Sequence, residues 1–465
     1  MSVPARRRDH RASILVAALS SAFGVLLIQV TGALASMIGG TDLGESQTVR
    51  AMLTIVAFIF IVIAVYVGSI VTVNTFATII AGRTRTIALL RLIGSSARSQ
   101  RRAVGNEGFT VGLIGALVGG VTGVLLSFAI VQIAMAASVM PRFDYALFDP
   151  LSAAPVVIVI VSTWLASWVG SRRVLTVSPM QAIGASAERS VDEGRRQRGR
   201  NASAIALMSV GVLLLLGGVV LGLVSPLGVL VGLLGGLLSF SGLVLGAHLV
   251  MPPILSLTGR LLGSSAPAKL AAANALRYPE RSSRSTIGLV IGVTLITMFA
   301  VAAQSFQDIM TTAQGARPED NAEVSQIIGV TVTIFSVLIG FSALIAAVGM
   351  VNNLALAVLQ RTRELGLLRA LGFTVGQVRR MILAESLQMT IAAVGFGLVL
   401  GIFYGWAGAV SLLGSQAGIG LMAPSIPWPL LVGCVVGATL LTLGASLSPA
   451  RRATTVSPTV ALAAE

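Results

Sequence analysis

Long uninterrupted apolar stretches dominate the chain. A stretch of roughly 20 residues is long enough to cross a bilayer as a helix. Membrane-spanning β-strands would instead alternate apolar and polar residues over about ten positions, and these stretches do not alternate. The pattern therefore predicts an all-α polytopic membrane protein with ten transmembrane helices, at residues 13–36, 52–81, 108–137, 152–170, 203–224, 226–250, 286–304, 327–357, 386–410 and 428–447.

The charged residues are distributed unevenly between the loops that join these stretches. The chain carries a net charge of +15, and with a cytoplasmic N-terminus only Arg50, Arg142 and Arg317 of its 32 lysines and arginines fall on the outer side. Cytoplasmic loops of membrane proteins are enriched in Lys and Arg. We therefore expect a multi-pass protein of the plasma or inner membrane with both termini in the cytoplasm. Its positive charge then faces the anionic inner leaflet of the lipid bilayer and does not indicate nucleic-acid binding.

An internal repeat relates the two halves of the chain. Residues 73–107 match residues 351–385 at a constant offset of 278, including arginines, an asparagine and a glutamate that compositional bias would not align in order. After one residue of slippage, Arg172-Arg173 matches Arg451-Arg452. Both copies start in the cytoplasm, so we expect two repeats of the same orientation, related by a pseudo-twofold axis along the membrane normal.

The repeat divides the ten predicted helices into a 4+2+4 arrangement. The first four-helix unit covers residues 1–184 and the second covers residues 268–465. Residues 203–267 form an inserted two-helix hairpin. Residues 185–202 are highly charged and nearly devoid of large apolar side chains, which is typical of a flexible linker.

Each repeat contains a short basic segment between its second and third predicted helices. In the second copy, Leu365, Leu368 and Leu371 fall on one side of a helix that Gly372 is placed to end. The arginines occupy the other faces. We expect each segment to be an amphipathic helix that presents apolar and cationic groups to something beneath the membrane. A solvated basic loop that merely obeys the charge rule is the alternative.

A few polar and small residues inside or beside the apolar stretches suggest further roles. Glu107 and Glu385 are expected at helix N-termini where the chain re-enters the membrane, where the helix dipole favours an acid; a proton relay is the alternative. We expect His248 to be a neutral hydrogen-bonded residue near the membrane face, although an ionisable group in an apolar helix is also a functional candidate. Glycines at intervals of four residues, such as Gly232 and Gly236, predict close helix contacts, either fixed or rearranging.

The sequence lacks the motifs of common enzymes. The only lysine, Lys269, lies in APAKLA, so the chain has no phosphate-cradling G-x-x-x-x-G-K-[ST] motif. Two histidines and the single Cys434 cannot build a metal site by themselves. We therefore expect no catalytic residue, metal ion or cofactor on this chain.

Three motifs resemble the FtsX-like permease family, the MacB, LolC and BceB kind of ABC system. They are RTRELGLLRALG with the following RRMILAES, the closing PARRATTVSPTVALAAE, and ANALRYPERSSRS before residue 286. The resemblance implies that residues 83–94 and 361–372 are coupling helices that dock on two cytoplasmic ATPase subunits, which bind ATP and Mg²⁺. The implied coupling residues are Arg83, Arg85, Leu90, Arg91, Gly94, Arg361, Arg363, Glu364, Leu368, Arg369 and Gly372, with Glu107 and Glu385 at the membrane edge.

This sequence departs from the family pattern in two places. The first copy has Thr86 and Ala88 where the second has the family's usual Glu364 and Gly366, so the two docking sites need not be equivalent. The outer loops at about 37–51 and 305–326 are too short for the large extracytoplasmic domain of MacB and LolC. Two coupling helices in one chain imply one permease chain per pair of ATPases.

The resemblance implies a permease that exports, or extracts from the membrane, an amphipathic, lipid-like or peptide substrate while a partner hydrolyses ATP. One alternative is a mechanical transmitter that regulates an extracellular partner such as a cell-wall hydrolase. Another is an ion-driven transporter, which would need charged or unwound elements at the membrane midplane that the sequence does not show.

Overall fold

The computed structural model describes residues 3–39, 94–136, 150–171, 198–261, 266–277, 279–313, 367–415 and 421–455, with single positions between 55 and 73 and between 339 and 347. Every regular element within these ranges is helical. The helices are α1 (Val3–Gly39), α4 (Ala97–Ala136), η2 (Pro150–Ser152), α5 (Ala153–Gly170), α9 (Arg198–Gly222), α10 (Gly228–Leu245), α11 (Ala247–Leu261), α12 (Ala266–Arg277), α13 (Pro279–Ala313), α16 (Val375–Leu413) and α17 (Trp428–Thr455).

The described helices are those of a multi-pass membrane protein. Seven helices in the described part of the chain are long and apolar enough to cross a bilayer, namely α1, α4, η2 with α5, α9, α10, α13 and α16, and α17 contains a shorter apolar stretch at Trp428–Gly444. The expected helices at 52–81 and 327–357 lie largely outside the described residues. The all-helical class is thus confirmed, and the count of ten stays a prediction.

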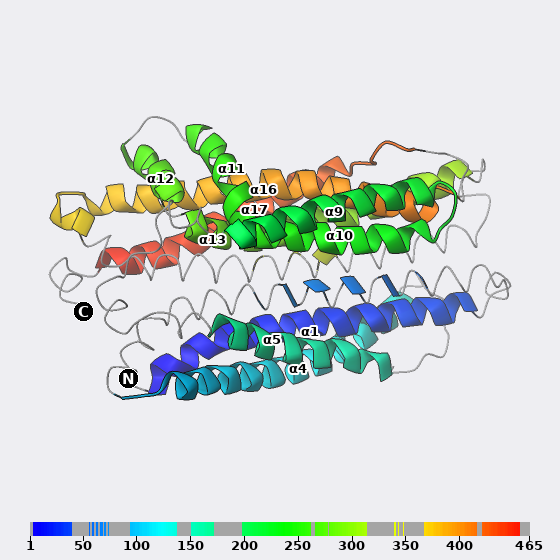
Figure 1. Ribbon diagram of the computed structural model, residues 1–465, viewed down its shortest axis with the longest axis horizontal. Coiled ribbons are helices and arrows are strands. Elements are labelled where there is room, and N and C mark those ends of the chain that lie inside the picture. Colours follow the sequence, from blue (N-terminus) through cyan, green and yellow to red (C-terminus); the bar gives the residue numbers. More distant parts are fainter. Residues whose placement is uncertain are drawn as a thin grey trace.

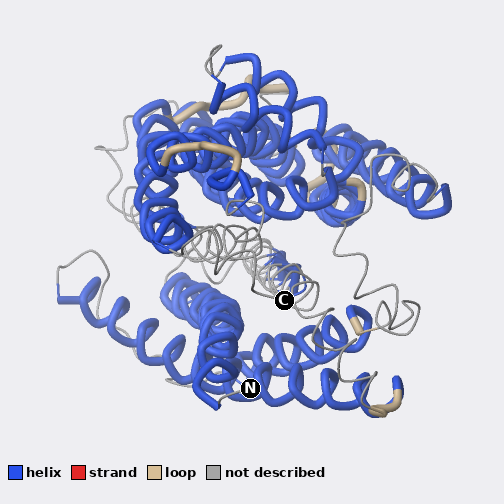
Figure 2. Tube along the Cα trace, turned by 90° about the vertical axis from the view of Figure 1, so that its left-hand side faces the viewer, coloured by secondary structure: helices blue, strands red, loops and turns tan. Residues whose placement is uncertain are grey.

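The described helices pack as two groups. Figure 1 shows α1, α4 and α5 side by side, separate from a larger group of α9 to α13, α16 and α17, and the end-on view in Figure 2 shows the same division. The most extensive helix–helix packing is between α1 and α4 in the first group, and between α13 and α16 and between α9 and α10 in the second. One apolar cluster includes Phe23 of α1, Val67, Phe240 of α10 and Phe299 of α13, so the main core lies where the groups approach each other.

Close helix contacts depend on glycine at several helix pairs. In α4 and α16, a side chain at Gly119 or Gly401 would meet backbone and side-chain atoms of α1 or α13, respectively. In the α9–α10 hairpin, Gly218 lies against the backbone of Gly232. The sequence prediction of close contacts is confirmed at these positions. Gly236, however, has nothing among the described residues within 4 Å of an added Cβ, so it does not belong to the packed face.

The third helix of each unit begins earlier than expected. Ser96 caps α4 by accepting a hydrogen bond at its Oγ from the Ser99 amide, 3.2 Å away. Thr374 forms a capping box with Gln377 at the start of α16, again with an N···O distance of 3.2 Å. Glu107 and Glu385 therefore lie about three turns inside their helices. The expectation that a helix N-terminus stabilises them was wrong, because that effect is confined to the first turn.

The predicted helix at 226–250 is broken. α10 ends at Leu245, Gly246 follows as its C-cap, and α11 starts at Ala247. His248 therefore belongs to α11, and its Nε2 lies 2.8 Å from Oδ1 of Asn201 near the start of α9. The expectation of a hydrogen-bonded histidine is confirmed. The break was missed because apolar residues continue on both sides of Gly246.

Candidate functional site

The structure describes only part of the two predicted coupling segments. Gly94, Leu368, Arg369 and Gly372 are described. The other proposed coupling residues lie outside the described residues, and for them the assignment stays a prediction: Arg83, Arg85, Leu90, Arg91, Arg361, Arg363 and Glu364.

Both segments end at a glycine with left-handed backbone geometry. The φ angle is +100° at Gly94 and +97° at Gly372, a conformation that glycine adopts without steric cost. At Gly372 the chain forms two further hydrogen bonds, from the Gly372 amide to the Arg369 carbonyl (3.1 Å) and from the Phe373 amide to the Leu368 carbonyl (3.0 Å). This pair of bonds is the Schellman motif that ends α-helices. The predicted helix stop at Gly372 is confirmed.

The end of the second coupling segment is fastened to two other helices. Leu368 and Phe373 pack on a buried cluster formed by Ala271 of α12 and by Val378, Met381 and Ile382 at the start of α16. Because these apolar groups leave water together, residues 367–373, α12 and the first turns of α16 form one packed body. This role of α12 was not predicted from the sequence, because it depends on contacts with segments about 100 residues away along the chain.

Two leucines of the same segment point away from that cluster. Leu367 is 52% exposed and Leu371 is 72% exposed, one helical turn apart, while Leu368 is half-buried. The expected stripe of Leu365, Leu368 and Leu371 is therefore divided, because Leu368 makes the inner contact and Leu371 is exposed beside Leu367, while Leu365 lies outside the described residues. α16 begins at the end of the molecule where α1 begins and α17 ends (Figure 1). An exposed apolar pair beside arginines at that end offers a surface for a protein partner.

The two membrane-edge acids differ in burial. Glu385 is only 6% exposed on α16, whereas Glu107 is half-buried on α4. Near Glu107, the guanidinium carbon of Arg101 lies 3.9 Å from the centre of the Trp168 ring of α5, a distance suited to a cation–π interaction. Among the described residues, no three His, Cys, Asp or Glu side chains gather closely enough to hold a metal ion.

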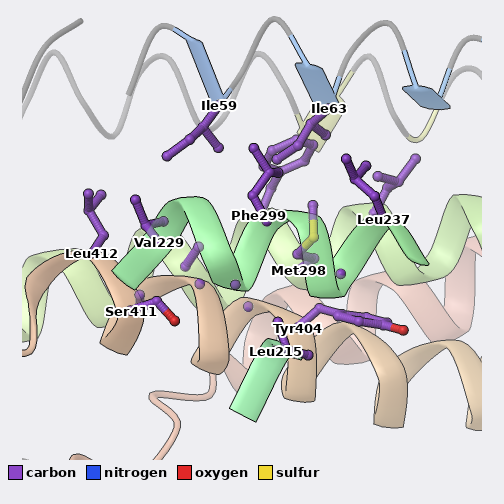
Figure 3. Close-up of a pocket in the computed structure, with 18 of the residues that line it drawn as sticks. Ile59, Ile63, Leu215, Val229, Leu237, Met298, Phe299, Tyr404, Ser411 and Leu412 are labelled. Atoms are coloured by element: carbon purple, nitrogen blue, oxygen red, sulfur yellow. The ribbon is translucent and has the colours of Figure 1, made fainter. Parts of the chain in front are cut away.

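A second candidate site is a cavity of about 200 Å³ between the larger helix group and Ile59, Ile63, Tyr66 and Val67. Figure 3 shows its side chains converging from residues 59–67, α10, α13 and α16, with Leu215 contributed by α9. Labelled examples are Ile63, Leu237, Phe299 and Leu412. The sequence could not reveal this site, because its walls come from segments that are far apart along the chain.

The polar groups at the cavity wall are mostly satisfied by α10. The Tyr66 hydroxyl lies 2.7 Å from Oγ of Ser241 and donates to the carbonyl of Leu237 at 2.9 Å. The Tyr404 hydroxyl lies 2.9 Å from Oγ of Ser239. Both tyrosine rings also pack edge-on against Phe240, at centroid distances of 6.5 and 6.0 Å. These bonds turn the hydroxyls toward α10, so the cavity is lined almost entirely by hydrocarbon.

Comparison with known proteins places the chain among permeases. Residues 58–179 and 336–458 each match the family described as FtsX-like permease C-terminal, which together is more than half of the chain. The chain is 31% identical over 142 residues to the uncharacterized ABC transporter permease YknZ of Bacillus subtilis, covering 30% of this chain and 34% of the relative. It is 30% identical over 132 residues to the ABC transporter permease YtrF of Bacillus subtilis, covering 27% and 30%.

A longer alignment relates the chain to an exporter that includes its own ATPase. The chain is 29% identical over 195 residues to the macrolide export ATP-binding/permease protein MacB of Hyphomonas neptunium, covering 41% of this chain and 29% of that protein. The alignments thus span about a third of the length of these relatives. The two matched regions include α4 with α5 and α16 with α17, and therefore both repeats.

Proposed function

Because the chain belongs to the FtsX-like permease family, we propose that it is the membrane subunit of an ABC transporter. In this proposal a separate ATPase hydrolyses ATP, and the chain couples that hydrolysis to export or membrane extraction of an amphipathic, lipid-like or peptide substrate. The observation that carries the proposal is the duplicated element: each family match contains a basic segment that ends at a left-handed glycine and leads into a capped helix. The chain has no phosphate-binding motif of its own, so ATP and Mg²⁺ are assigned to the partner.

The proposed architecture is two four-helix units joined by a linker and a hairpin. We assign residues 1–184 and 268–465 to the units, 185–202 to the linker and 203–267 to the hairpin, with both termini in the cytoplasm. The close packing of α9 on α10 supports a hairpin. The start of α1, the starts of α4 and α16, and the end of α17 share one end of the molecule (Figure 1), which supports units of the same orientation.

The proposed assembly is one permease chain with two ATPase subunits. A pair of ABC ATPase subunits needs two docking sites on the membrane subunit. One permease chain carries two candidate coupling segments, at 83–94 and 361–372. Native mass spectrometry of the detergent-solubilised complex tests this ratio. A dominant species with two permease chains per two ATPases would show that the internal repeat does not replace a dimer.

The docking surface is tested at the exposed leucine. Leu371→Asp places a charge on the outer face of the segment without entering the packed cluster, so the permease should keep its thermal midpoint. We expect association with the ATPase that copurifies from native membranes to weaken at least tenfold, with a parallel loss of hydrolysis. Leu421→Asp is the matched control. Leu421 is similarly exposed (67%) but precedes the start of α17, whereas it is the other end of α17 that lies near the start of α16.

The cationic part of the docking surface is tested separately. Arg91→Glu combined with Arg369→Glu reverses one charge in each segment, and a docking face that complements an acidic partner should not tolerate the change. Undiminished association and hydrolysis in both this variant and Leu371→Asp would overturn the coupling assignment. Loss of association in these variants, together with a wild-type complex that hydrolyses ATP but moves no substrate, would instead favour the mechanical-transmitter alternative.

A further inference from the structure

We infer that the cavity between residues 59–67, α10, α13 and α16 binds a single hydrocarbon chain of a lipid-like molecule. The inference goes beyond the proposed function and does not depend on the coupling segments. It also does not follow from family membership, because α10 and α13 lie between the two regions that match the family. The cavity is a property of how the hairpin of this chain packs between residues of both units.

The wall chemistry selects an apolar occupant. Side chains such as Ile59, Ile63, Leu233, Met298 and Phe299 form most of the lining. The Tyr66 and Tyr404 hydroxyls are engaged by α10 and are not available to a ligand headgroup. Apolar cavities of this size in proteins exclude water and take up apolar ligands. In a membrane protein, the apolar molecules at hand are lipid chains.

The extent of the cavity along the helices fits a linear chain. Its lining runs from Val229 to Phe240 on α10 and from Thr294 to Phe306 on α13. At the rise of an α-helix, those spans correspond to roughly 16–18 Å along the helix axes. The apolar lining is therefore elongated along the helix axes. An elongated apolar space of this kind matches an extended acyl or prenyl chain.

One hydroxyl tests whether the occupant is purely hydrocarbon. Thr294 is 2% exposed and lines the cavity, and its Oγ1 has no hydrogen-bond partner among the described residues. A hydrocarbon chain leaves that hydroxyl unpaired, so removing it should not weaken binding. Thr294→Val, which keeps the shape of the side chain, should therefore retain or increase occupancy. A fall of more than threefold would show that the occupant brings a polar group to Thr294 and would overturn the assignment.

Two glycines allow the cavity to be filled without disturbing the helices. Gly236 and Gly408 both line it, and an added Cβ at either position meets nothing among the described residues within 4 Å. Gly236→Leu and Gly408→Leu should therefore occupy the space meant for the ligand. Gly217→Leu on α9 and Gly395→Leu on α16 are matched controls, because those glycines are equally open but do not line the cavity.

The experiment is photolabelling of the purified full-length chain without its ATPase. One probe is palmitic acid with a mid-chain diazirine, and the second is phosphatidylglycerol that carries the same chain, so that the two arms distinguish a free acid from a bilayer lipid. We expect labelling with at least one probe on peptides that contain Met298 or Leu412. Labelling should fall at least fivefold in the two cavity-filling variants and stay within twofold of the wild type in the two controls.

Thermal midpoints measured on the same samples show whether each variant is folded. If labelling avoids α13 and α16 with both probes, or if folded cavity-filling variants label as strongly as the controls, the inference is wrong. Either result leaves the coupling tests at Leu371 unaffected. Conversely, undiminished ATPase association in the coupling variants, together with intact labelling, would change the proposed function but not this site.

Discussion

The two units that carry the family match pack their long helices alike but differ at the start of the third helix. In the first unit, Gly119 and Gly123 of α4 lie against α1, and in the second, Gly401 and Gly405 of α16 lie against α13. At the start of α16, an apolar cluster fastens the coupling segment to α12. At the start of α4, the corresponding residues are smaller or more polar.

The repeat shows which substitutions cause the difference. At the offset of 278 residues, Gln100, Ala103 and Val104 stand where α16 has Val378, Met381 and Ile382, respectively. Gln100 donates a hydrogen bond to Oγ of the neighbouring Ser95 at 2.6 Å, and Ala103 is exposed. Among the described helices, α4 packs on α1 and α5 and has no counterpart of α12.

We expect the two proposed coupling segments to be held with different stiffness. Burial of several apolar side chains favours one arrangement of residues 367–373 relative to α16. A turn held by capping hydrogen bonds gains less, because each such bond contributes only about 1 kcal/mol. We therefore expect movement of the ATPase on the second segment to be transmitted to α16 more directly than movement on the first is transmitted to α4.

The largest expected difference follows from one pair of equivalent positions. Met381→Asp places a carboxylate in a site that is 1% exposed, and burying an unpaired charge costs several kcal/mol. Ala103→Asp changes an exposed position and should alter stability by no more than about 0.5 kcal/mol. ATP hydrolysis by the assembled complex should fall at least fivefold in the first variant and less than twofold in the second. Equal losses in both variants would show that the two segments are fastened alike.

A smaller effect should be the same in both units. Gly94→Val and Gly372→Val force a β-branched residue into a left-handed conformation, which costs about 1–3 kcal/mol. Gly94→Asn and Gly372→Asn should cost less, because asparagine tolerates this region. Hydrogen exchange of the first turns of α4 and α16 measures the local fraying directly. If the valine variants exchange no faster than the asparagine controls, the positive φ angles are not needed to stop the preceding helices.

Much of the fold could be predicted from hydrophobic runs and from the residues that end helices. The helix stop at Gly372 followed from a glycine placed after an amphipathic turn, and the duplicated segments followed from matched arginines. The starts of α4 and α16 were missed because Ser96 and Thr374 cap helices whose first turns are polar and lie before the apolar run. The break at Gly246 was missed because flanking residues on both sides are apolar.

The sites were less predictable than the helices. Leu371 was expected on the docking face, and its exposure fits that expectation. The inward contact of Leu368 depends on α12, which comes from nearly 100 residues earlier in the chain. The cavity requires Ile63, Leu237, Phe299 and Leu412 to meet from four segments, and neither periodicity nor spacing encodes such a meeting. Side-chain neighbours of this kind are decided by tertiary packing.

The smallest expected effect concerns the cation–π contact between Arg101 and Trp168 in the first unit. At the offset that aligns Arg172-Arg173 with Arg451-Arg452, Leu447 stands where the first unit has Trp168. Trp168→Leu makes the first unit resemble the second, and a partly buried cation–π contact at 3.9 Å should contribute about 1 kcal/mol. Trp168→Leu also removes buried ring area, so a double-mutant cycle with Arg101→Met is needed to isolate the pair. We expect a coupling free energy of about 0.5–1 kcal/mol in thermal or denaturant unfolding.

Arg102→Met is the control, because Arg102 is an exposed arginine on the same turn of α4, and its cycle with Trp168→Leu should give a coupling near zero. Equal coupling in the two cycles would mean that Trp168 stabilises α5 through its area alone and that the first unit gains nothing specific from Arg101.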